Sequence, residues 1–85
     1  MNKRHLSKEL HGRAAAYILG EVKTLKLRGD KRTVSAIHRV VEASRALYDT
    51  LTDCEPTSTA VALALANKKD AASDLRKITG ITWLL

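Results

Sequence analysis

The stretch KRTVSAIHRVVEASRALYDTL, Lys31 to Leu51, decides the fold of this 85-residue chain. Its apolar residues recur at alternating spacings of three and four, the period of an amphipathic helix. A seam with one polar member is flanked by a second apolar row; the seam is Val34, Ile37, Val41, Ser44, Tyr48 and Leu51, and the row is Ala36, Val40, Ala43 and Leu47. So broad an apolar face predicts contact with two neighbouring helices.

One further amphipathic helix is predicted on each side of this segment, because each flank contains an apolar stripe and a residue that favours a helix start. Ser7 can cap the first helix, whose apolar residues follow one another mainly at spacings of four. Pro56 fits only the start of the last helix, with Glu55 or Thr57 as its cap. The sequence therefore predicts helices over residues 7–28, 31–51 and 57–79.

Glycines mark two of the expected helix ends. We expect Gly29 to end the first helix and Asp30 to cap the second, with Gly20 inside the first helix. Gly80 is expected to end the third helix in a left-handed conformation, with Ile81 folding back in a Schellman motif. Short connections between helices of matched length favour antiparallel neighbours. We predict a single all-α domain, residues 1–85, an antiparallel three-helix bundle with the apolar C-terminal tail ITWLL.

Positive charge is concentrated in the first half of the chain. Residues 1–45 contain 11 Lys and Arg against 4 Asp and Glu, a net charge of +7, whereas residues 46–85 contain 4 against 5, a net charge of −1. A basic surface of this kind suits phosphate groups, anionic lipid or an acidic protein. The longest uncharged run, residues 56–67, is too short to span a bilayer. We expect a cytoplasmic protein without a membrane partner.

Patterns that indicate catalysis or metal binding are absent from the sequence. No Cys or carboxylate stands at metal-ligand spacing from the three histidines, His5, His11 and His38. Cys54 has no CxxC partner, and Asp70 and Asp74 are surrounded by basic residues, as expected for a solvated helix face. We expect no enzyme activity, no metal and no cofactor.

A small basic helical protein raises the question of a helix-turn-helix motif. Placing Gly29 at the turn glycine of that motif puts polar residues at all of its apolar positions. With Gly20 at the turn, the register fails at Glu21, Lys26 and Gly29. The segment TVSAIHRVVE is therefore better explained by the core seam than by a recognition helix.

The stretch KLRGDKRT, Lys26 to Thr33, contains an Arg-Gly-Asp tripeptide but is best explained as a corner between two helices. Lys31 and Arg32 fall in the first turn of the second helix, where positive charge costs about 0.3–1 kcal/mol. Rules of this kind are broken most often at functional sites. The predicted anion-binding or nucleic-acid-binding residues are Lys23, Lys26, Arg28, Lys31 and Arg32. A separate basic group, Lys3, Arg4 and Lys8, is expected at the opposite end of the bundle.

Two functions remain open from the sequence. The first is nucleic-acid binding through phosphate contacts, or a role in a nucleic-acid-associated complex. The second is a regulator, adaptor or inhibitor in the style of phage or plasmid accessory proteins, docking on a larger acidic protein. A homodimer is also compatible with so small a core. The candidate partner-binding residues for the second function are Arg39, Arg45, Trp83, Leu84 and Leu85.

Overall fold

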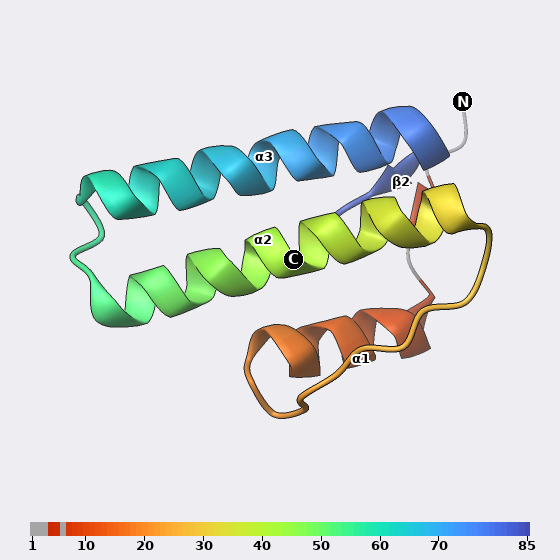
Figure 1. Cartoon of the computed structure of the whole chain (residues 1–85), viewed down its shortest axis with the longest axis horizontal. Coiled ribbons are helices and arrows are strands. Elements are labelled where there is room, and N and C mark those ends of the chain that lie inside the picture. The colour runs from red at the N-terminus through yellow and green to blue at the C-terminus, as the bar shows by residue number, and fades with distance from the viewer. Residues whose placement is uncertain (1–3, 6) are drawn as a thin grey trace.

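The computed structural model describes residues 4–5 and 7–85, and three helices dominate it (Figure 1). The helices are α1, Lys8–Ile18, α2, Lys31–Asp53, and α3, Thr59–Thr79. Two short parallel strands, β1 at Arg4–His5 and β2 at Ile81–Thr82, pair Arg4 with Ile81 and His5 with Thr82. The predicted all-α, three-helix fold is confirmed, and the strands attach the N-terminal segment beside the end of α3.

The two long helices α2 and α3 form an antiparallel hairpin (Figure 1). A turn closed by the hydrogen bond from the Ser58 N–H to the Glu55 carbonyl, 3.0 Å, connects them. Ser58 caps α3, because its hydroxyl accepts from the Val61 N–H at 3.3 Å. The expected caps Glu55 and Thr57 were therefore wrong by one to three residues, because Pro56 lies in the turn and not in the helix.

The first helix ends ten residues earlier than predicted. Gly20, with φ of 79°, lies just after the helix in the left-handed region that glycine tolerates best. The Gly20 N–H donates to the Tyr17 carbonyl at 3.1 Å and the Glu21 N–H to the Ala16 carbonyl at 2.9 Å. These two bonds make a Schellman motif. The 11 residues of α1 span about 16 Å, against about 34 Å for the 23 residues of α2.

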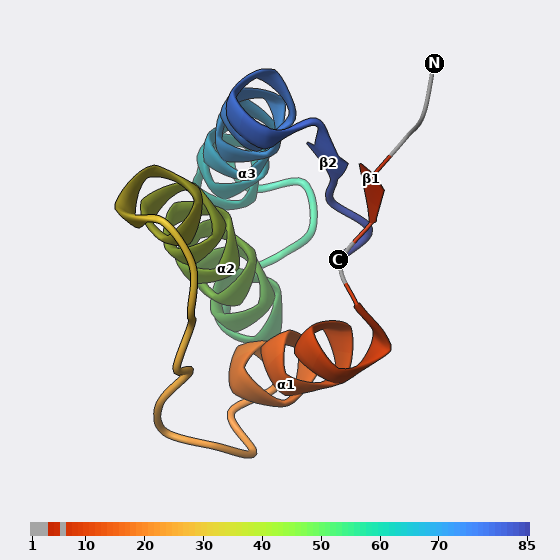
Figure 2. The ribbon, with the colours of Figure 1, turned by 90° about the vertical axis from the view of Figure 1, so that its right-hand side faces the viewer.

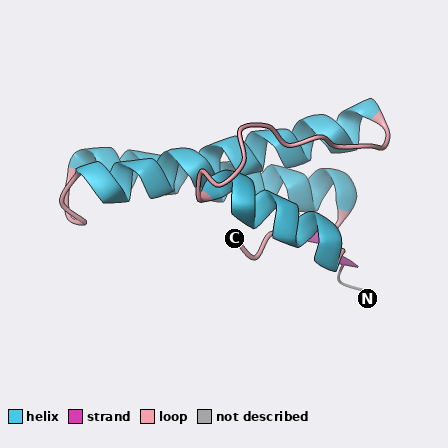
Figure 3. Cartoon of the chain, turned by 90° about the horizontal axis from the view of Figure 1, so that it is seen from below, coloured by secondary structure: helices cyan, strands magenta, loops and turns pink. Residues whose placement is uncertain are grey.

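Residues 19–30 form a long connection instead of the last turns of α1. The connection returns along the helices, so that α1 runs in roughly the same direction as α2 (Figures 1 and 3). Within it, Leu25 and Leu27 pack on the core, whereas Thr24, Lys26 and Arg28 are exposed. The expected short connection and matched helix lengths are thus wrong for α1, and the antiparallel arrangement applies to α2 and α3.

The core lies around the first half of α2. Val40 and Val41 are completely buried there, packed in one cluster with Ala14 of α1 and Leu75 of α3. The tail and the 19–30 connection flank α2 on opposite sides (Figure 2). Because α1 is short, it leaves the far half of the hairpin uncovered (Figure 1). Two members of the predicted seam, Tyr48 and Leu51, are consequently 44% and 46% exposed.

The C-terminal end of α3 differs in detail from the prediction. Gly80 is left-handed as expected, with φ of 78°, and its N–H donates to the Arg76 carbonyl at 2.8 Å. The Ile81 N–H, however, donates to the Thr79 hydroxyl at 3.1 Å. Ile81 therefore begins β2 and does not complete a Schellman motif, because the tail continues along the core. Within the described part of the chain, no helix combines the length and apolarity needed to cross a membrane.

Candidate nucleic-acid interface

The corner that begins α2 is built by Asp30. Its carboxylate accepts from the Thr33 N–H at 3.1 Å, which makes Asp30 the N-cap of the helix, as predicted. Hydrogen bonds from the side chain and then the backbone of Thr33 lower the pKa of Asp30 below its ordinary value. Lys31 and Arg32 occupy the first helical turn, which contains no acidic residue. The predicted placement of these two cations in the first turn is therefore confirmed.

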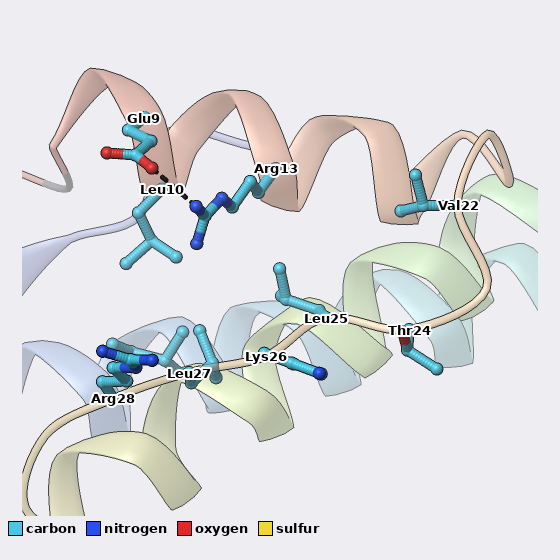
Figure 4. Close-up of a pocket in the computed structure, with 10 residues that line it drawn as sticks. Glu9, Leu10, Arg13, Val22, Thr24, Leu25, Lys26, Leu27 and Arg28 are labelled. Atoms are coloured by element: carbon cyan, nitrogen blue, oxygen red, sulfur yellow. Dashed lines mark hydrogen bonds and ion pairs between the residues drawn. The ribbon is translucent and has the colours of Figure 1, made fainter.

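A cleft of about 690 Å³ lies between α1 and the 19–30 connection (Figure 4). Leu10 on α1 and Leu25 and Leu27 on the connection line it with apolar surface, together with Ile37 of α2. Its charged lining residues are Glu9, Arg13, Lys26 and Arg28. The Arg13 guanidinium donates to the Glu9 carboxylate at 2.6 Å, across one turn of α1. Three cations therefore face one carboxylate at this cleft.

Four of the five predicted basic residues lie close together in the sequence, within residues 26–32. Lys26 and Arg28 border the cleft, and Lys31 and Arg32 follow at the start of α2; we call these four residues the basic edge. All four are exposed, and none makes an ion pair with any residue that the structure describes. The fifth residue, Lys23, is exposed on the connection but does not line the cleft.

Further basic residues lie at the same end of the molecule, and of these Arg76 and Lys77 were missed in the sequence. Arg76 and Lys77 form the last turn of α3, which lies beside the start of α2 in the hairpin (Figure 1). Lys8 begins α1 at this end, and Arg4 lies in β1 beside the chain that follows α3. The predicted placement of Arg4 and Lys8 at the opposite end is therefore wrong, because α1 does not run antiparallel to α2. Lys3 lies outside the described residues.

The basic side chains proposed for partner binding are engaged within the molecule. Arg39 donates a hydrogen bond to the Asp74 carboxylate of α3. The Arg45 guanidinium lies 4.7 Å from the centre of the Tyr17 ring, whose hydroxyl donates to Glu42. Both arginines thus hold helices together.

The tail residues proposed for partner binding divide into packed and exposed side chains. The Trp83 indole N–H donates to the Ser44 hydroxyl at 2.9 Å, and Leu85 packs against the core. Leu84 is 64% exposed. Trp83 is therefore first of all a structural residue, and Leu84 is the large apolar side chain that the tail offers to solvent.

No protein-family model, curated protein or solved structure matches this chain. Among the side chains that the structure describes, no three His, Cys, Asp or Glu residues are grouped so that they could hold a metal ion. The function is therefore inferred from the geometry of the basic edge and the cleft.

Proposed function

We propose that this protein is a small, non-enzymatic nucleic-acid-binding protein that holds phosphate groups through its basic edge. The observation that carries the proposal is the group of four exposed, unpaired cations within residues 26–32. Cations in the first turn of a helix oppose the helix dipole, and because the Asp30 carboxylate already caps this helix end, an added anion would act by neutralising the two cations. A phosphate beside Lys31 and Arg32 would do so.

The placement of the four cations supports a polyanion as the ligand. Lys26 and Arg28 are exposed and alternate with the half-buried Leu25 and Leu27, so both lie on the solvent side of the connection. Arg76 and Lys77 extend the positive potential over the neighbouring end of α3. Neither the edge nor the cleft contains an aromatic residue on which a base could stack. We therefore expect binding that depends weakly on sequence.

The experiment is a salt titration of binding to duplex DNA, followed by fluorescence anisotropy. If the four cations of the basic edge each neutralise a phosphate, the logarithm of the association constant should fall against the logarithm of salt with a slope of roughly −3.6. The double variant Lys31→Gln with Arg32→Gln should bind more weakly and reduce that slope by about two.

The matched control is Lys68→Gln with Lys69→Gln, which removes the same charge from the middle of α3. This variant should retain most of the affinity and nearly all of the slope. Absence of binding at low salt would overturn the proposal. So would equal losses in the two double variants, because net charge alone would then explain the affinity.

A further inference from the structure

Among the residues that the structure describes, none pairs its backbone with the backbone of residues 22–29. Along the chain, the last hydrogen bond between backbone groups before this segment is donated by the Glu21 N–H, and the next is accepted by the Asp30 carbonyl. Within the part of the chain that the structure describes, no backbone N–H or carbonyl from residue 22 to residue 29 bonds another backbone group. An extended chain with unpaired edges is a template for a further strand.

The cleft lies along the edge of this extended segment. In an extended chain, alternate side chains point to opposite faces, and the backbone N–H and carbonyl groups point sideways. Every residue from Thr24 to Arg28 lines the cleft, including Leu25 and Leu27, which pack on the core, and Lys26, which is exposed (Figure 4). Because side chains from both faces reach the cleft, the cleft borders the backbone itself.

The residues that line the cleft indicate which kind of ligand fits it. Leu10, Leu25 and Leu27 are half-buried and contribute aliphatic surface over the buried Ile37, which suits an aliphatic side chain. Lys26 and Arg28 are unpaired cations at the rim, and Arg13 lies opposite them on α1 (Figure 4). The Arg13 pair with Glu9 is exposed, so a second carboxylate can compete for the guanidinium at small cost.

We propose that this cleft binds an extended peptide strand in which acidic residues alternate with aliphatic ones. The strand adds to the edge of residues 24–28, with backbone hydrogen bonds supplying affinity. Its aliphatic side chains face Leu10, Leu25 and Leu27. Its carboxylates meet Lys26, Arg28 and Arg13.

This inference goes beyond nucleic-acid binding and uses a partly different set of residues. Lys26 and Arg28 belong to both surfaces, so peptide and nucleic acid compete for the protein. Arg13 belongs only to the cleft, whereas Lys31 and Arg32 belong only to the basic edge. Variants at these positions therefore separate the two activities, and either one can fail while the other stands.

The test uses a set of capped seven-residue peptides in which Glu alternates with Val, Ile, Leu or Thr. Binding to the full chain is followed by amide NMR shifts and by amide hydrogen exchange. At least one such peptide should bind and slow exchange at alternate amides within residues 24–28 by about tenfold or more. Arg13→Gln should weaken this binding about two- to fivefold without changing the affinity for DNA.

Three controls decide the outcome. The same peptides with Lys in place of Glu, or with alternate amides N-methylated, should not bind, because charge or backbone pairing is lost. The Lys31→Gln, Arg32→Gln variant should bind peptide normally while losing affinity for DNA. The proposal is overturned if no acidic peptide binds, if the N-methylated peptides bind equally well, or if an oligonucleotide and no peptide protects amides 24–28.

Discussion

Asp30 shows how a single residue can carry a misleading motif. It is the last member of the Arg-Gly-Asp tripeptide, but its carboxylate is turned onto the Thr33 N–H at the start of α2. Gly29, with φ of 142°, provides the backbone conformation that leads into this cap. The capping role follows from local sequence. An Asp immediately before the first helical residue accepts from the backbone N–H three residues later, which would otherwise lack a partner.

The lowered pKa of Asp30 predicts a pH dependence of stability. Its pKa is lower in the folded than in the unfolded protein, so its contribution is fully present above the unfolded pKa and is lost as pH falls through the folded value. Asp30→Asn keeps a capping side chain but cannot titrate. Thermal melts from about pH 5 to about pH 2 should therefore show a smaller acid-induced drop for Asp30→Asn than for the unchanged protein. Equal drops would contradict this role.

The connection after α1 is the element that changed most between expectation and structure. Thr24 to Arg28 alternates apolar and polar residues, which is the period of an extended chain. This signal is short, and the spacing of Val22 and Leu25 also fits a helix. Gly20 resolves the ambiguity, because once the chain turns there, Leu25 and Leu27 reach the core only from an extended segment.

Gly12 within α1 and Gly20 just after it should respond in opposite directions to alanine. Gly12→Ala lies in the helix with free space around the new methyl group, so it should stabilise the protein by up to about 1 kcal/mol. Gly20→Ala also meets no atom, but its φ of 79° disfavours a side chain and should destabilise by about 1 kcal/mol. Chemical unfolding of both variants measures the difference. Stabilisation by both would show that α1 can extend through residue 20.

At the scale of the whole molecule, the tail joins elements that are distant in sequence. Trp83 reaches Ser44, the one polar residue of the predicted seam, and β2 holds β1 next to it. Ser44 is buried, and its hydroxyl accepts a hydrogen bond from the Trp83 indole N–H. This bond explains why a polar residue lies in the apolar seam, since buried polar groups need a hydrogen-bond partner. The small core is completed in this way without a third long helix.

A double-mutant cycle tests this connection. Ser44→Ala removes the acceptor and Trp83→Phe removes the donor, and each should cost about 1 kcal/mol or more. The double variant should cost less than the sum of the two by roughly 1 kcal/mol, because both changes remove the same hydrogen bond. Additive losses in urea unfolding would mean that the bond contributes nothing to stability.

Local sequence by itself determined the helical class, the caps at Ser7 and Asp30, the left-handed Gly80 and the cations at the start of α2. These features depend on spacing and on contacts within one turn, which neighbouring residues settle among themselves. Only the tertiary structure decided where α1 stops and which way it runs. It also decided that Lys8, Arg76 and Lys77 join the basic edge at one end. The reason is that a turn at Gly20 gains its advantage from Leu25 and Leu27 packing on the core, a contact between segments that no local pattern contains.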